Sequence, residues 1–145
     1  MANLIIETLD YFLNEKLNIP EDTALYISSE GLSYGSTGDA ALNLATYKGV
    51  LLSKLYEHYK GRLFGLYTYS PITIKAVAGC ASKKNQTSKT PMIDAYKREN
   101  VNNAFHASLV KGDFINKTAY IQCVDDIVDS YFALITMLDK EGFLK

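Results

Sequence analysis

Hydrophobic positions in the first half of the chain alternate between helical and strand-like spacing. Residues 4–17 place apolar side chains on one side of a helix, which predicts an amphipathic helix. Leu4, Ile5, Leu9, Phe12 and Leu13 lie on this side, together with Thr8. The apolar runs 24–29 and 63–69 predict two strands, and residues 39–59 between them predict a helix. The first half therefore reads helix, strand, helix, strand.

The second half predicts helices separated by polar segments. Residues 72–78 predict a short helix that ends at Gly79, because glycine suits the position just after a helix. Residues 90–98 predict a second helix, and the polar segment between the two predicts a loop. The last helix is expected from about Asp125 to Lys140.

Residues 100–118 show no clear periodicity, so no element is predicted there. The order of elements predicts an α/β fold, and the length of 145 residues predicts a single domain over 1–145. Two strands are a thin sheet for so much helix, which indicates a truncated sheet with packed helices.

Composition narrows the class of protein without naming its function. Hydrophobic residues make up 48% and charged residues 21%, as in an ordinary soluble domain. No apolar run approaches the roughly 20 residues of a membrane span, so no membrane partner is expected. Cys80 and Cys123 lack metal-type spacing, and the N-terminus lacks a signal peptide, which predicts a cytoplasmic protein.

Charge is distributed unevenly along the chain. Between Lys75 and Arg98 there are six basic residues and one acid, a net charge of +5 in a chain whose total is −1. A basic segment on an otherwise acidic protein suits a phosphate backbone that approaches one face. The alternative is a solvated loop that is rich in lysine.

Three aspartates stand near the expected start of the last helix. Residues three apart share a helix face, so Asp126 and Asp129 are expected to point the same way, with Asp125 beside them. Two neighbouring carboxylates repel each other unless a cation lies between them, and hard oxygen ligands suit Mg²⁺. The alternative is that these acids complement the macrodipole at a helix N-terminus.

Glu30 ends the first predicted strand and precedes a segment rich in glycine. Ligand and catalytic groups of open α/β sheets gather at the carboxyl ends of strands. Glu30, Asp126 and Asp129 could therefore converge on divalent metal and act on a phosphodiester. The alternative for Glu30 alone is a solvent-facing acid at a strand end.

Three segments carry a resemblance to a known family. The first is residues 24–30, followed by 39–44 and 48–50 at the family's spacing. The second is residues 69–79, continuing through Ser88-Lys89 to 92–95. The third is Asp126-Ile-Val-Asp129-Ser-Tyr-Phe-Ala-Leu. Together they resemble a RuvC-type Holliday-junction resolvase of the ribonuclease-H-like superfamily, and phage versions more than cellular ones.

The resemblance implies a Mg²⁺-dependent endodeoxyribonuclease, with Mn²⁺ as the other candidate ion, that resolves four-way DNA junctions in a bacterial host cell. It assigns Glu30, Asp126 and Asp129 as catalytic metal ligands and Lys89 as the catalytic lysine near the scissile phosphate. It also implies a homodimer through the helix that begins at Asp39. The expected DNA contacts are Lys75, Lys83, Lys84 and Lys89, with Tyr34 as a candidate aromatic wedge.

The chain also departs from the family pattern. Family members begin with a D-x-G or D-x-S strand that supplies the first catalytic aspartate, whereas a predicted helix and a connector precede Glu30 here. Asp10 lies in that helix and is no substitute. We therefore expect the C-terminal portion of a resolvase, which is inactive alone if no separate N-terminal fragment supplies the aspartate. The alternatives are a junction-binding remnant that does not cut DNA and a small structural phage protein.

Overall fold

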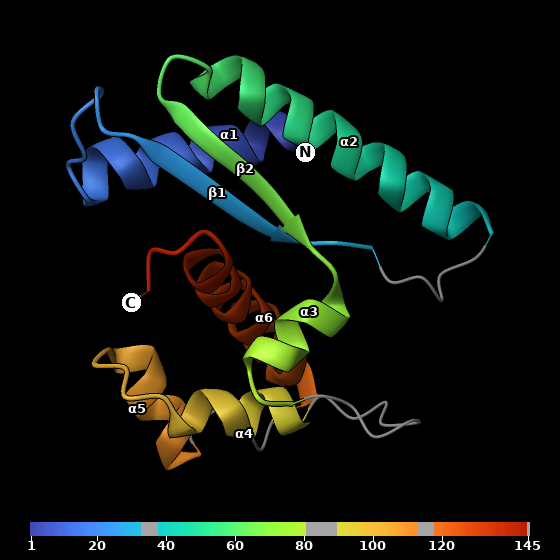
Figure 1. The fold of residues 1–145 in the computed structure, drawn as a ribbon, viewed down its shortest axis with the longest axis vertical. Coiled ribbons are helices and arrows are strands. Elements are labelled where there is room, and N and C mark those ends of the chain that lie inside the picture. Colours follow the sequence, from blue (N-terminus) through green and yellow to red (C-terminus); the bar gives the residue numbers. More distant parts are fainter. Residues whose placement is uncertain (33–37, 81–89, 113–117, 145) are drawn as a thin grey trace. The chain divides into compact units, whose positions relative to one another are not determined.

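Two parallel strands, β1 (Leu25–Glu30) and β2 (Leu63–Tyr69), lie side by side (Figure 1). The Leu25 amide donates to the Arg62 carbonyl at 2.7 Å, and the Gly31 amide donates to the Tyr69 carbonyl at 2.6 Å. Residue numbers rise in the same direction along both strands between these two bonds, as in a parallel pair. The connection between them contains α2 (Asp39–Tyr59), so the segment is a βαβ unit. The predicted mixed α/β class is confirmed.

The computed structural model describes residues 1–32, 38–80, 90–112 and 118–144. The chain divides into two units. The first consists of Met1–Ile27 and Leu32–Tyr67, and the second consists of Ser28–Gly31 and Thr68–Lys145. The carboxyl ends of both strands therefore belong to the second unit.

The N-terminal helix begins earlier than its periodicity predicts. The structure has α1 (Ala2–Asp10), which continues into a π-helix, η1 (Tyr11–Lys16). Half of the predicted apolar side is covered, because Ile5, Leu9 and Leu13 are half-buried, whereas Leu4 and Phe12 are exposed. The prediction of one buried face is therefore only partly right.

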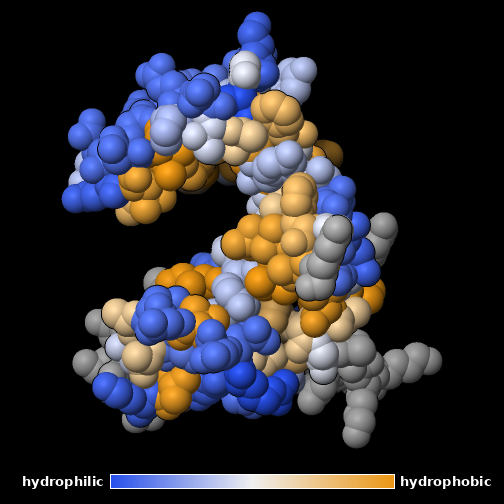
Figure 2. All heavy atoms as spheres, turned by 60° about the vertical axis from the view of Figure 1, so that its left-hand side comes forward, coloured by the Kyte–Doolittle hydropathy of each residue, from blue (hydrophilic) through white to orange (hydrophobic). Residues whose placement is uncertain are grey.

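The long helix α2 has the predicted bounds. Gly38 precedes it with a φ of 85°, a backbone conformation that glycine adopts without strain, and Asp39 places an acid in the first turn. α1 packs against α2. Hydrophobic side chains also reach the protein surface (Figure 2). On α2 these include Leu42, Leu44 and Val50, and Leu42 is 67% exposed.

Four helices belong to the second unit. They are α3 (Pro71–Val77), α4 (Thr90–Arg98), α5 (Ala104–Lys111) and α6 (Thr118–Lys140). The predictions for the first two are confirmed within one residue. α5 lies in the segment for which no element was predicted. α6 begins seven residues before the predicted start at Asp125, so that boundary was wrong.

The core of the second unit lies among these helices, since α6 contacts α3 and α4, and α4 contacts α5 (Figure 1). Its buried cluster consists of Ile74, Met92, Ala95, Tyr96, Leu109, Val124, Val128, Phe132 and Ala133. Phe132 is 1% exposed and Val128 is fully buried, both on α6. α6 is therefore held firmly along the side that carries these residues, which fixes the opposite side as well.

Candidate functional site

An acidic pocket of about 290 Å³ lies where β1 ends. Its lining comes from Ser28, Ser29 and Glu30 on β1 and from Asp126, Asp129, Ser130 and Ala133 on α6. All of these residues belong to the second unit. The fold thus brings Glu30 to the same pocket as Asp126 and Asp129, although α2, β2 and three further helices separate them in the sequence.

Hydrogen bonds hold the strand side of the acidic pocket. Glu30 is the last residue of β1, and the next amide, that of Gly31, donates to Tyr69 of β2. The Ser29 hydroxyl lies 3.1 Å from the Thr68 hydroxyl across the two strands. A Cβ at Gly31 would stand 3.1 Å from the Tyr69 carbonyl oxygen, so the close approach of the strands favours glycine here. Glu30 therefore projects from an anchored strand end.

The buried side of α6 determines which of its residues face the acidic pocket. Val128 and Phe132 point into the core, which leaves Asp126 exposed and Asp129 half-buried at the pocket. Asp125 is 3% exposed and does not line the pocket. The three neighbouring aspartates thus divide into one core residue and two pocket residues.

The macrodipole interpretation of these aspartates does not agree with the helix bounds. α6 begins at Thr118, so Asp126 and Asp129 lie beyond its second turn. The favourable effect of the helix dipole falls off within the first turn.

Carboxylate and hydroxyl oxygens are the donors that hard divalent cations prefer. Glu30, Asp126 and Asp129 supply the carboxylates of the acidic pocket, and three serines stand beside them. Among the residues that the structure describes, no three histidine, cysteine, aspartate or glutamate side chains are close enough to hold one metal ion. The chemistry of the donor set fits Mg²⁺, whereas the three carboxylates do not enclose a single point.

Lys75 is the one expected DNA contact that lies within the described residues. It is half-buried in the last turn of α3. Burial raises the pKa of the nearby Cys80 thiol, while Arg98 and Lys75 act in the opposite direction. This thiol donates to the Pro91 carbonyl at 3.1 Å.

The remaining predicted site residues are Tyr34, Lys83, Lys84 and Lys89. All four lie outside the described residues. Their proposed roles in DNA binding, and that of Lys89 in catalysis, stay predictions.

Sequence reasoning missed the serines of the acidic pocket. The signal that could have found Ser28 is strand alternation, since residues two apart in a strand share a face and Ser28 stands two before Glu30. Ser130 follows Asp129 directly, and its hydroxyl donates to the Asp126 carbonyl at 2.7 Å. Ser130 is therefore engaged by its own helix.

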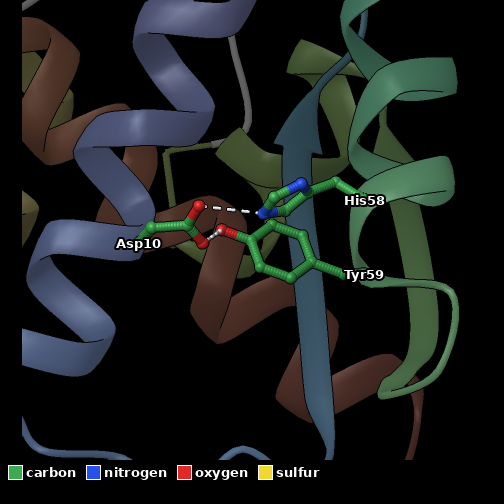
Figure 3. Close-up of polar contacts among 3 residues, drawn as sticks. All are labelled: Asp10, His58 and Tyr59. Carbon is green, nitrogen blue, oxygen red and sulfur yellow. Dashed lines mark hydrogen bonds and ion pairs between the residues drawn. The ribbon is translucent and has the colours of Figure 1, made fainter.

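A second pocket, of about 440 Å³, lies in the first unit. It is lined by Asn3, Ile6, Glu7, Asp10, Lys54, Glu57 and His58. Figure 3 shows the Asp10 carboxylate facing two side chains of α2, those of His58 and Tyr59. His58 Nε2 is 2.8 Å from one of its oxygens, and the Tyr59 hydroxyl donates to the other at 2.8 Å.

The contacts of Asp10 indicate a structural role in joining α1 to α2. Lys54 Nζ adds a third polar contact between these helices, donating to Asn3 Oδ1 at 2.8 Å. Burial, together with the nearby Asp10 carboxylate, raises the pKa of Tyr59 well above its ordinary value, so the hydroxyl stays protonated and keeps donating. Asp10 lies in α1 as predicted and does not line the acidic pocket.

No protein-family model, no curated protein and no solved structure matches the chain. Across the described ranges, no helix is both long enough and apolar enough to pass through a bilayer. Function is therefore inferred from the residues of the chain and from the acidic pocket that they form.

Proposed function

We propose that the chain is the catalytic part of a Mg²⁺-dependent endodeoxyribonuclease of the RuvC type, which cuts four-way DNA junctions. The observation that carries the proposal is the presence of Glu30, Asp126 and Asp129 around one pocket. The first lies at the carboxyl end of a parallel strand, where α/β proteins place functional groups. The other two lie one turn apart on a well-packed helix.

A divalent cation would suit the negative charge that these three carboxylates bring to one pocket. Glu30, Asp126 and Asp129 would hold the metal, which supplies Lewis-acid stabilisation of charge on a phosphodiester and an activated water. β1 and α6 are anchored, so that ordering on binding would be confined to the carboxylate side chains.

The basic segment supports DNA as the partner. The segment from Lys75 to Arg98 carries a net charge of +5 and includes Lys83, Lys84 and Lys89. We propose that these side chains contact phosphates, with Lys89 beside the scissile phosphate and Tyr34 as a wedge at the junction. Such contacts release counterions, so binding should weaken steeply as salt rises.

The exposed side chains of α2 support self-association. Leu42, Leu44 and Val50 are exposed on one helix, and burying apolar area is the main driving force of stable interfaces. We propose a homodimer through α2. The described sheet contains β1 and β2 and no strand with a D-x-G motif, so the proposal includes a separate polypeptide that supplies the remaining aspartate and extends a ribonuclease-H-like sheet.

A cleavage assay on DNA of defined shape tests this function. The full chain is incubated with DNA and Mg²⁺, alone and in a parallel sample with a D-x-G fragment. It should cut a four-way junction and leave linear duplex of the same sequence intact. Salt-sensitive junction binding without cleavage in either sample would instead identify a binding remnant. Neither binding nor cleavage would favour a structural protein.

A further inference from the structure

Asp10 contacts the last turn of α2 through both of its carboxylate oxygens (Figure 3). His58 Nε2 lies 2.8 Å from Oδ2, and the Tyr59 hydroxyl donates to Oδ1 at 2.8 Å. The imidazole also stands edge-on to the Tyr59 ring, with 4.6 Å between the ring centroids. An ionised carboxylate only accepts hydrogen bonds, so the His58 nitrogen that faces Asp10 must carry a hydrogen.

Polar contacts hold much of α1 against α2. Ala2 is buried, whereas the remaining residues of α1 are half-buried or exposed. Asp10 is the last residue of α1 and directly precedes the π-helix η1. Near the start of α1, Asn3 accepts a hydrogen bond from Lys54 Nζ at 2.8 Å. A weaker contact at Asp10 should therefore loosen the C-terminal end of α1.

The surroundings of His58 favour a positive charge on its imidazole. The charged and titratable groups around it, from α1, from α2 and from the residue before β2, are Glu7, Asp10, Lys54, Glu57, Tyr59 and Arg62. Three of these are acids and two are basic, and both basic side chains are engaged, Lys54 by Asn3 and Arg62 by the Thr23 carbonyl. Burial and the Asp10 carboxylate raise the pKa of Tyr59 well above its ordinary value, so Tyr59 donates throughout the physiological range.

We propose that the Asp10–His58 contact is a pH-sensitive tie between α1 and α2, an inference that does not depend on the proposed function. A histidine imidazole changes its charge between about pH 5 and pH 8. Protonation turns a neutral hydrogen bond into a charge-assisted one, which is roughly twice as strong. The added stability is present at the acidic end of this range and is lost as the pH rises. The side chains of His58 and Asp10 are 44% and 34% exposed, so solvent reaches the pair and also screens it.

Amide hydrogen exchange of α1 at about pH 5.5 and about pH 8 tests the tie, because it measures local stability. Protection factors correct for the intrinsic effect of pH on exchange. In wild type, those of α1 should fall by about 2- to 5-fold between the two conditions, the size expected of an exposed ion pair. His58→Gln, which carries no charge, should show no such fall. His58→Lys, which is charged at both pH values, should keep the higher protection at about pH 8.

His106→Gln is the matched control, because His106 is the other histidine of the chain and lies in α5 of the second unit. Its α1 should lose protection with pH as in wild type. Asp10→Asn removes the charge that attracts the imidazolium and provides a second variant of the same contact, which should abolish the fall. Circular dichroism verifies the fold of each variant. The inference is overturned if protection of α1 in wild type does not change with pH, or if it changes equally in His58→Gln.

Discussion

We expect Asp126→Asn to lower the proposed Mg²⁺-dependent junction cleavage by at least about 100-fold, the size of effect seen when one preorganised charge-stabilising group is removed. The amide keeps the shape of the side chain and removes its negative charge. Asp126 is exposed at the acidic pocket and takes no part in the buried core, so the variant should fold normally. The rate is measured under single-turnover conditions, with the D-x-G fragment present if wild type requires it.

Asp139→Asn provides the control on the same helix. Asp139 is exposed near the end of α6, 3.4 Å from Lys140 Nζ, and does not line the acidic pocket. Its cleavage rate should match that of wild type. Equal rates in Asp126→Asn and wild type would remove the catalytic assignment of this aspartate.

Phe132→Ala should destabilise the protein by about 3–5 kcal/mol. Phe132 is among the most deeply buried side chains of the cluster that joins α6 to its neighbours, and its removal leaves a cavity. A loss of this size is a large part of the total stability of a small domain. Urea denaturation, followed by circular dichroism, gives the change in the free energy of unfolding.

Leu134→Ala serves as the comparison two residues further along α6. Leu134 is 43% exposed and lies on another side of the helix. Its replacement should cost less than about 1 kcal/mol, since it removes less buried apolar surface. Similar losses in both variants would contradict the described position of α6 in the core.

Local signals in the sequence determine most helices and strands of this chain. The bounds of α2, β2 and α4 agree with their predictions, because a small set of glycines, prolines and polar caps marks them. Ser70, for example, accepts a hydrogen bond from the Thr73 amide and precedes Pro71 at the start of α3. Such signals act within a few residues and can be read without knowing the fold.

The missed helix α5 carries similar signals in a less regular setting. Asn103 accepts a hydrogen bond from the His106 amide at 2.7 Å, and Gly112 ends the helix with a φ of 82°. Both are typical helix boundaries, but the short apolar pattern between them gave no clear period. The early start of α6 was missed because the acids at Asp125 and Asp126 are typical of a helix N-terminus.

Contacts between distant residues could not be predicted from spacing. Asp126 and Asp129 were expected on one face because three residues separate them, and they do line the same pocket. Glu30 could be added to this pair only through the resemblance to a known family, since β1 and α6 are brought together by the tertiary fold and not by their spacing in the sequence. The link of Asp10 to His58 and Tyr59 carried no sequence signal at all.

The central proposal is that Glu30, Asp126 and Asp129 bind divalent metal at the acidic pocket, and Glu30→Gln tests it most directly because Glu30 is remote in sequence from the other two. The measurement is a Mg²⁺ titration of the melting temperature for wild type and for this variant. At a Mg²⁺ concentration of 100 times the dissociation constant, the free energy of unfolding of wild type should rise by about 2.7 kcal/mol. Glu30→Gln should lose most of that gain, because the amide removes one anionic ligand of the cation. An equal rise in both proteins, or none in wild type, would contradict the claim.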